Sequence, residues 1–566
     1  MAEIHGLMES RADRRRLLRA GALGAGGLAA ATLVACGGGD KSAPAGGGTQ
    51  GAERKLATAV ASEAKRGGKV SERVGGDAPN LSLFAASAYT ARATSMVYSK
   101  LLRMHVGYPD VPGNSTKIEP DLASKHEQPD ELTLTFTLRP GVKWQNVAPA
   151  NGRTLTAEEV KGAMEAFRTD KNSAFRADWE PVERIETPDA QTIRVVSKQP
   201  FAPLLNTIIA GHYGARIFPL ELLDGDKIKT QTAGTGPFIL DSYRAGDSLN
   251  FKRNPDYFRQ GFPYLDEVTF RIIPDESSAT AAFQTEQLDV TTMSCTDFEQ
   301  VQRAKPKTVS FEDLGTGGFI SLNTTKPPFN DKRVRQALSI GFNRMAERAA
   351  LFCGRGDYDQ ILPPGNVDQA LKVKDMGPLA KNWDFNIAEA KKLMEAAGFA
   401  SGFETSVVYT PQYGDLYRSS LERVIGDWAQ IGVRLRAPQS IEYSQWISSV
   451  YRPPFNFDGI LWGPGRVYTD PEPYLWFWLH PSGIANQSRV NDQRATDMLE
   501  KQRRTLNVDE RWKIIHEIER LNADEMWYLH RNTGVEIATT QPWVKNWGPE
   551  KQYAQTRYEH VWIDKG

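Results

Sequence analysis

Residues 131–144 read ELTLTFTLRPGVKW, and residues 155–160 read LTAEEV. The first half of the longer stretch alternates apolar and hydroxyl side chains, which is the period of a half-buried β-strand, and the Arg-Pro-Gly that follows indicates a turn. In the second stretch Thr156 and Glu159 have the spacing of a capping box, so a helix is predicted to begin there. A strand, a turn and a helix in this order predict mixed α/β structure.

Similar helix boundaries recur further along the chain. Asn386 precedes a run with apolar residues at helical spacing, and Gly398 ends that run as a C-terminal cap does. A second predicted helix, at about residues 416–431, ends at Gly432 and leads directly into a predicted strand at 433–436. These repeated steps from helix to strand predict an α/β fold.

Five groups of residues, taken in chain order, resemble the large solute-binding proteins of bacterial ABC importers, the family that serves dipeptides, oligopeptides and nickel. The match covers the chain from about residue 80 to 530. Read from the residues alone, these groups form turns, linkers and core helices, so they identify the scaffold and not the ligand. The groups are LRPGVKW (138–144) with LTAEEV (155–160); GTGPF (234–238) with RNPDYF (253–258); LDEV (265–268); LN (322–323) through PF (328–329), Asp331, RVRQAL (333–338) and Arg344; and AKKL (390–393) with AGF (397–399).

The resemblance implies an α/β, periplasmic-binding-protein-like clamshell of the class II type, with two lobes and an additional inserted domain. Two crossing segments would form its hinge, and a captured solute would contact both lobes, because closure requires contacts that favour the closed state. The predicted boundaries are residues 1–36 for a signal peptide, 37–70 for a flexible tether, 71–105 with 200–310 and 495–566 for a discontinuous lobe I, 106–199 for the inserted domain, and 311–494 for lobe II.

A candidate ligand-binding loop, residues 460–471, reads ILWGPGRVYTDP. It runs from a predicted buried strand into a Gly/Pro-rich loop, where backbone can approach a ligand and where Trp462 and Tyr468 offer flat surfaces. In peptide-binding relatives the similar loop has an acidic residue that receives the free ammonium of the peptide. Here Arg466 is the only charge between Trp462 and Asp470. Arg466 therefore either receives an acidic group of the ligand or is a solvated loop arginine.

Two further candidates come from other parts of the chain. Tyr89 ends the segment 80–89, which lines the cleft in relatives, and Asn323 follows a predicted strand. Core packing is the alternative for Trp462, and a structural role in a turn is the alternative for Asn323. The predicted ligand-binding residues are Tyr89, Asn323, Trp462, Gly463, Arg466, Tyr468 and Asp470.

The N-terminal region has the pattern of an export signal. RRRLLR at 14–19 precedes an Ala/Gly/Leu-rich run that ends in LVAC at 33–36, which is typical of a secretory signal and resembles a lipoprotein signal. Cys36 would then be acylated and become the first residue of the mature protein. The arginines favour Tat export, with Sec export and an uncleaved membrane helix as alternatives. We therefore expect an exported, membrane-anchored lipoprotein that faces the periplasm or the cell exterior.

Charge and cysteine content exclude several classes of partner. The chain has 69 Lys and Arg residues and 69 Asp and Glu residues, so it lacks the basic excess of nucleic-acid-binding proteins. Beyond Cys36 only Cys295 and Cys353 remain. They are either two buried thiols or a disulfide, which an oxidising compartment would allow. Neither their number nor their spacing indicates a metal site, and no cofactor is predicted.

These observations predict a monomeric solute-binding lipoprotein that captures a peptide or similar organic solute in an interlobe cleft and delivers it to an ABC permease. The same scaffold would also suit an oligosaccharide, an anionic solute or a metal chelate, or a tethered receptor without transport. A secreted enzyme is the remote alternative. The sequence has no G-x-S-x-G, H-E-x-x-H or phosphate-loop motif, so the chain is predicted not to be an enzyme.

Overall fold

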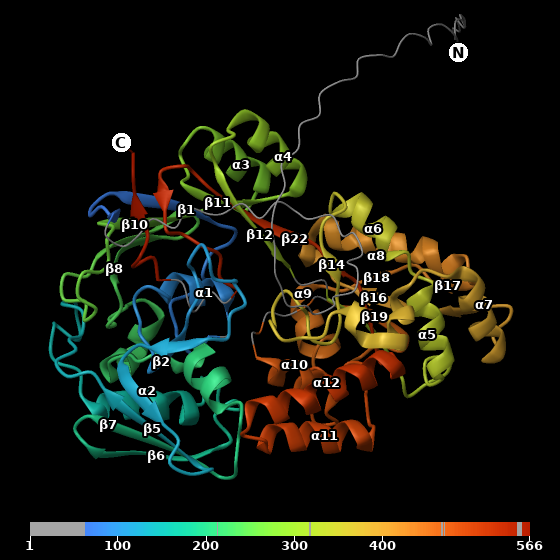
Figure 1. Cartoon of the computed structure of the whole chain (residues 1–566), viewed down its shortest axis with the longest axis horizontal. Helices are drawn as coiled ribbons and strands as arrows, with labels where there is room; N and C mark the ends of the chain where they lie inside the picture. The colour runs from blue at the N-terminus through green and yellow to red at the C-terminus, as the bar shows by residue number, and fades with distance from the viewer. Residues whose placement is uncertain are drawn as a thin grey trace, which may run out of the picture. The chain divides into compact units, whose positions relative to one another are not determined.

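The computed structural model of the chain describes residues 63–85, 87–211, 213–315, 318–463, 465, 468, 470–551 and 557–565. All of these belong to one compact unit, Leu56–Gly566 (Figure 1). The predicted signal peptide with Cys36, and most of the predicted tether, lie outside the described residues. The described part is mixed α/β, as the sequence predicts.

The large sheet contains seven strands, in which β1 runs parallel to both β10 and β11. The other neighbours are antiparallel, including β22, which lies between β11 and β12. Strands β1, β11 and β12 therefore end at the same edge of the sheet, and β22 begins there. In spatial order the strands are β12 (Val309–Leu314), β22 (Val535–Thr540), β11 (Val290–Met293), β1 (Lys69–Val74), β10 (Glu267–Ile272), β9 (Ser248–Arg253) and β8 (Phe238–Arg244).

The second sheet contains five strands. Strand β16 is parallel to β18 and β19, while β13 is antiparallel to β19 and β20. Strands β16, β19 and β20 therefore end at the edge where β13 begins. In spatial order the strands are β18 (Gln439–Ser440), β16 (Val407–Tyr409), β19 (Ile460–Trp462), β13 (Phe319–Leu322) and β20 (Tyr528–His530).

The chain passes between the two sheets twice, as the resemblance implies. It leaves the large sheet at the end of β12 and enters the second sheet at β13. It returns from β20 through β21 (Asn532–Thr533), which pairs with β14 (Asp357–Tyr358), and enters β22. Both crossing segments therefore join the edge where β12 ends to the edge where β13 begins (Figure 1).

A four-stranded sheet contains the stretch that opens the sequence analysis. The predicted strand is β5, and its residues Leu134, Phe136 and Leu138 are buried. The predicted capping box is present: Thr156 Oγ1 accepts from Glu159 N at 3.2 Å, and Glu159 Oε2 accepts from Thr156 N at 2.9 Å. The sheet order is β4 (Ala123–Glu127), β5 (Thr133–Leu138), β7 (Thr192–Ser197) and β6 (Val182–Asp189), with α2 (Ala157–Thr169) next to it.

The other predicted helix boundaries are also confirmed. Asn386 caps α7 by accepting from Glu389 N at 3.0 Å, and α8 leads into β17 past Gly432. The remaining α-helices are α1 (Ala88–Thr94), α3 (Glu276–Gln284), α4 (Cys295–Ala304), α5 (Lys332–Ile340), α6 (Arg344–Leu351), α7 (Ile387–Ala396), α8 (Gly414–Ala429), α9 (Tyr443–Gln445), α10 (Pro471–Leu479), α11 (Gln493–Arg504) and α12 (Val508–Glu525).

Short strand pairs and short helical segments complete the described part. The strand pairs are β2 (Leu102–Met104) with β3 (Ile118–Pro120), β15 (Phe403–Thr405) with β17 (Val433–Leu435), and β23 (Val544–Lys545) with β24 (Trp562–Ile563). The helical segments are η2 (Leu204–Gly211), η3 (Tyr213–Ala215), η4 (Leu220–Lys229), η5 (Val373–Trp383), η6 (Pro411–Tyr413) and η7 (Trp446–Val450). Within the described ranges, none of the helices combines the length and the apolar content needed to cross a lipid bilayer.

The hydrophobic cores follow the sheets and bear on the domain boundaries. One core joins the large sheet to the four-stranded sheet. Two others contain the second sheet and helices α10, α11 and α12. Residues 495–529, predicted in lobe I, thus share their cores with residues of predicted lobe II. The domain boundaries stay a prediction, and this packing favours a limit of lobe II near the second crossing segment.

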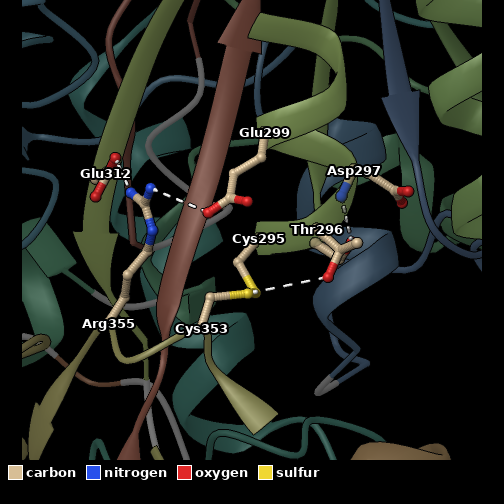
Figure 2. Close-up of a disulfide and its surroundings, with 8 residues drawn as sticks. Cys295, Thr296, Asp297, Glu299, Glu312, Cys353 and Arg355 are labelled. Atoms are coloured by element: carbon tan, nitrogen blue, oxygen red, sulfur yellow. Dashed lines mark hydrogen bonds and ion pairs between the residues drawn. A yellow bond between two sulfur atoms is a disulfide. The ribbon is translucent and has the colours of Figure 1, made fainter. Parts of the chain in front are cut away.

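Cys295 and Cys353 form a disulfide, which decides between the two alternatives that the sequence leaves open (Figure 2). Cys295 begins α4, which follows β11 of the large sheet, and Cys353 lies in the turn after α6. Arg355, next to this turn, forms an ion pair with Glu312 of β12 and lies 3.9 Å from Glu299 of α4. The disulfide and this arginine therefore bind the turn after α6 to the large sheet and its helix.

Candidate functional site

A pocket of about 180 Å³ lies at the edge where β1, β11 and β12 end and β22 begins. Ligands of α/β proteins bind beyond the carboxyl ends of parallel strands, where the connections of the chain diverge. This edge is such a place, because both crossing segments start or end there. The strands contribute Glu72, Arg73, Val74, Thr292, Phe311, Asp313, Glu536 and Ala538 to the lining, and Gly75 directly follows β1.

Helix α1, the C-terminal segment and the residues after β2 form the rest of the pocket wall. Tyr89 of α1, one of the predicted ligand-binding residues, lines the pocket and has 41% of its surface exposed. A ring with this exposure can stack on a bound solute. The other lining residues are Arg92, Val106, Gly107, Trp547, Gly548, Pro549, Glu550, Lys551, Arg557, Tyr558, His560 and Val561.

The charges of the pocket are mixed and largely paired. Arg92 contacts Glu550 at 2.7 Å and forms a second, closer ion pair with Glu72. Lys551 Nζ lies 3.5 Å from a carboxylate oxygen of Asp313 and 3.5 Å from one of Glu536. Burial raises the pKa of Asp313, and Lys551 opposes this shift. A wall with both signs of charge suits a solute that itself has both signs, as an amino acid or a short peptide does.

Trp462 lies at the end of β19 in the second sheet and is fully buried. Its Nε1 donates to the carbonyl oxygen of Tyr417 at 3.2 Å, and the Tyr417 hydroxyl donates back to the carbonyl oxygen of Trp462. The two rings meet edge to face, with centroids 6.0 Å apart. In this structure Trp462 thus packs in the core of the second sheet, and its contact with a ligand stays a prediction.

Gly463 and Tyr468 lie next to Trp462 in the predicted loop. Gly463 N donates to Phe319 O at 3.1 Å, and Gly463 O accepts from Arg531 Nη2 at 3.1 Å. Tyr468 N donates to the Tyr474 hydroxyl at 3.0 Å. Arg466 lies outside the described residues. The structure therefore brings Gly463 together with a buried arginine, Arg531, that the sequence analysis does not single out.

Asp470 and Asn323 both take part in local hydrogen bonds. Asp470 caps α10 by accepting from Glu472 N at 2.8 Å and lies 3.3 Å from Arg511. Asn323 Oδ1 accepts from Thr325 Oγ1 at 2.7 Å and from Thr325 N at 3.3 Å. These contacts are the structural roles of a helix cap and a turn, and a contact of either residue with a ligand stays a prediction.

The pocket residues that the sequence analysis missed come from distant parts of the chain. Glu72, Arg92 and Glu550 meet through ion pairs, although no spacing in the sequence connects them. Arg531 had a weak signal, because it is a charged residue directly after the apolar strand β20. Over the described ranges, no group of three or more His, Cys, Asp or Glu side chains is placed to hold a metal ion.

Comparison with known proteins gives consistent matches. The family described as bacterial extracellular solute-binding proteins, family 5 Middle, matches residues 117–486. The glutathione-binding protein GsiB of Salmonella typhimurium is 29% identical over 312 residues, which are 54% of this chain and 58% of that protein. GsiB of Escherichia coli O157:H7 is 27% identical over 311 residues, 54% of this chain and 57% of that protein. The chain thus spans a little more than half the length of these curated relatives.

Solved structures share the fold. The periplasmic binding protein DppA from Helicobacter pylori, in complex with the peptide STSA, superposes with a TM-score of 0.71 at 22% identity, over 88% of this chain and 99% of that one. MoaA from A. tumefacien R10, in complex with mannopinic acid, has a TM-score of 0.70 at 24% identity, over 89% of this chain and 100% of that one. These similarities confirm the predicted class of fold.

Proposed function

The chain belongs to family 5 of the bacterial extracellular solute-binding proteins, and we propose that it captures a peptide or a related organic solute for an ABC importer. The curated relatives are named for glutathione, and the solved neighbours hold a peptide or mannopinic acid. Each of these solutes has at least one carboxylate. This shared chemistry supports a small solute with an acidic group, and it does not identify the compound.

The observation that carries the proposal is the position of the pocket. It lies where three strands of the large sheet end and where both crossing segments meet the sheet. A solute held there lies beside both crossing segments, and one that also reaches the second sheet would favour a closed state over an open one. The mixed charges and the exposed ring of Tyr89 give this pocket the polar and aromatic surfaces that a peptide requires.

The test is to identify what the purified protein holds. Native mass spectrometry of the full chain should show a retained compound, and calorimetry should then give its Kd, with glutathione and tri-alanine as the first probes. Scattering in solution should show a smaller radius of gyration with the bound compound than without it. The proposal would be wrong if no retained compound were found, neither probe bound, and the scattering stayed the same.

The export and anchoring of the protein are part of the proposal. A lipid on Cys36 would hold the binding domain at the outer face of the cytoplasmic membrane, close to a permease, and the monomer would dock on that permease. Metabolic labelling with a palmitate analogue should label the wild type and leave Cys36→Ser unlabelled. Equal labelling of both proteins would contradict the assignment of Cys36 as the acylated residue.

Tyr89→Ala should weaken solute binding by about 1 kcal/mol, or about fivefold in Kd, because a stacking ring is lost from the pocket. Calorimetry with the retained compound measures the change. Tyr443→Ala is the matched control, because Tyr443 is also 41% exposed and does not line the pocket. Equal Kd values for wild type and Tyr89→Ala would remove Tyr89 from the site.

A further inference from the structure

Arg531 is a buried arginine directly after β20, and only 6% of its surface is exposed. Its guanidinium lies against two rings, 4.7 Å from the centroid of Trp462 and 5.1 Å from that of Tyr417. Nη2 donates to Gly463 O at 3.1 Å, while the buried Nε has no hydrogen-bond partner among the described residues. Nη2 of this buried cation thus has a hydrogen-bond partner, and Nε has none among the described residues.

Two other buried arginines pair with carboxylates, whereas the buried Arg344 donates to the carbonyl oxygens of His530 and Ser339. Arg335 pairs with Glu525 at 3.1 Å, and Arg557 pairs with Asp121 at 2.6 Å. In the part of the chain that the structure describes, Arg531 forms no ion pair with a carboxylate. Burial lowers the pKa of Arg531, and Tyr417, Glu347 and Asp359 oppose this shift. Both carboxylates have other partners: Asp359 accepts from Gly318 N at 3.0 Å, and Glu347 accepts from Asn532 Nδ2 at 2.6 Å.

Besides the two rings, glycine backbone lies next to the guanidinium of Arg531. Gly318 has a φ of +90°, and a Cβ placed there would lie 2.4 Å from Arg531 Nη2 and 2.6 Å from Gly465 N. Only glycine allows the backbone to approach the guanidinium this closely. Gly463 lies at the same edge, so glycine backbone packs closely against the guanidinium beside the rings of Trp462 and Tyr417. We call residues Gly318, Gly463 and Gly465 the glycine edge.

A second unused polar group lies at the glycine edge. Strand β16 runs parallel to β19 with Val408 opposite Leu461, so Thr410 lies at the level of Gly463. Thr410 is fully buried, and its Oγ1 has no hydrogen-bond partner among the described residues. A buried hydroxyl and a buried guanidinium nitrogen at one sheet edge, both without partners among the described residues, indicate a polar group that these residues do not supply.

We propose that Arg531 receives a carboxylate of the captured solute at the glycine edge. This inference rests on the proposed function and names the chemical group that the solute must carry. A guanidinium is suited to the role because it can offer two parallel N–H donors to a carboxylate. An unpaired buried charge is costly, and an incoming carboxylate removes that cost only in the bound state. Arg531 would therefore act in binding, in a place where the sequence suggests Arg466.

The position of Arg531 also limits the size of the solute. Glu536 lines the pocket of the large sheet, and backbone from Arg531 to Glu536 spans at most about 18 Å. The other crossing segment gives the same limit from Gly318 to Asp313. A solute with a carboxylate on Arg531 and its other end in the pocket therefore has the length of a short peptide.

The binding test compares two probes, tri-alanine with a free carboxylate and tri-alanine amide. Wild type should prefer the acid by at least about tenfold in Kd, and Arg531→Gln should bind the acid at least about thirtyfold more weakly while its Kd for the amide changes little. Arg489→Gln is the control, because Arg489 also lies against a ring, 4.7 Å from that of Phe457, away from the glycine edge. A preference that persists in Arg531→Gln would overturn the inference.

A test without any ligand separates this inference from the proposed function. Arg531→Met should leave the Tm of the ligand-free protein unchanged or raise it, because it removes an unpaired buried charge. Arg335→Met should lower the Tm, because it removes an ion pair with Glu525 and the hydrogen bonds of Arg335 to the carbonyl oxygens of Glu525 and Phe329. If both variants lowered the Tm equally, Arg531 would be a structural residue and the inference would be wrong. If wild type bound neither probe, the peptide proposal would fail, and the melting temperatures would decide the role of Arg531.

Discussion

Replacing Cys353 with serine is expected to lower the free energy of unfolding by about 4 kcal/mol. The disulfide joins residues 58 positions apart, so it removes much of the conformational freedom of the unfolded chain. The disulfide also connects α4, next to the large sheet, to the turn after α6 (Figure 2). Without it, the ion pair of Arg355 with Glu312 would have to hold this turn in place. Urea unfolding under non-reducing conditions measures the loss.

The two cysteines provide their own control for this prediction. Cys295→Ser should lower the free energy of unfolding as much as Cys353→Ser does. The double variant should lower it no further, because all three variants lack the same bond. Wild type treated with a reducing agent should have the same free energy of unfolding as these variants. Arg355→Ala should lower the free energy of unfolding by less than about 1 kcal/mol, because its ion pairs are partly exposed to solvent. A loss below about 1 kcal/mol for both cysteine variants would show that the bond contributes little.

The local elements of the fold could be predicted because their signals lie close together in the sequence. The strand of residues 131–138 and the capping box of Thr156 and Glu159 each need only a few neighbouring residues, and both are present. The order of the large sheet could not be predicted this way. Strand β22 enters between β11 and β12 from more than two hundred residues further along the chain, and no local pattern specifies such a pairing.

The residues of the candidate site could likewise be predicted only in part, because distant parts of the chain form the site. Tyr89 is predicted because relatives suggest its segment, and it lines the pocket, while its contact with a ligand stays a prediction. For Trp462 the sequence could not decide between cleft and core, because an aromatic ring suits both and its partner Tyr417 belongs to a separate helix. Arg531 was missed, because only the folded chain shows that it has no carboxylate partner among the described residues.

Replacing Glu559 with alanine is expected to cost about 3–5 kcal/mol of the free energy of unfolding, because it breaks a buried ionic network. Glu559 is 1% exposed and accepts from Arg103 Nη2 at 2.6 Å, from Arg259, and from the hydroxyl of Tyr257. Burial by itself would raise the pKa of Glu559, but Arg103 and Arg557 hold it below its usual value. This contribution is therefore present at neutral pH and is lost as the pH falls through that lowered pKa.

Glu559→Ala should also weaken solute binding, because the chain neighbours of Glu559 form part of the pocket wall. Tyr558 and His560 line the pocket, and Glu559 lies between them in the chain. Urea unfolding gives the stability of Glu559→Ala, and calorimetry with the retained compound gives its affinity below the unfolding transition. Glu267→Ala is the control: Glu267 pairs with Lys69 at 3.2 Å on the surface, where such a pair contributes at most about 1 kcal/mol. If the two variants lost equal stability, the network around Glu559 would not hold the C-terminal segment against the pocket.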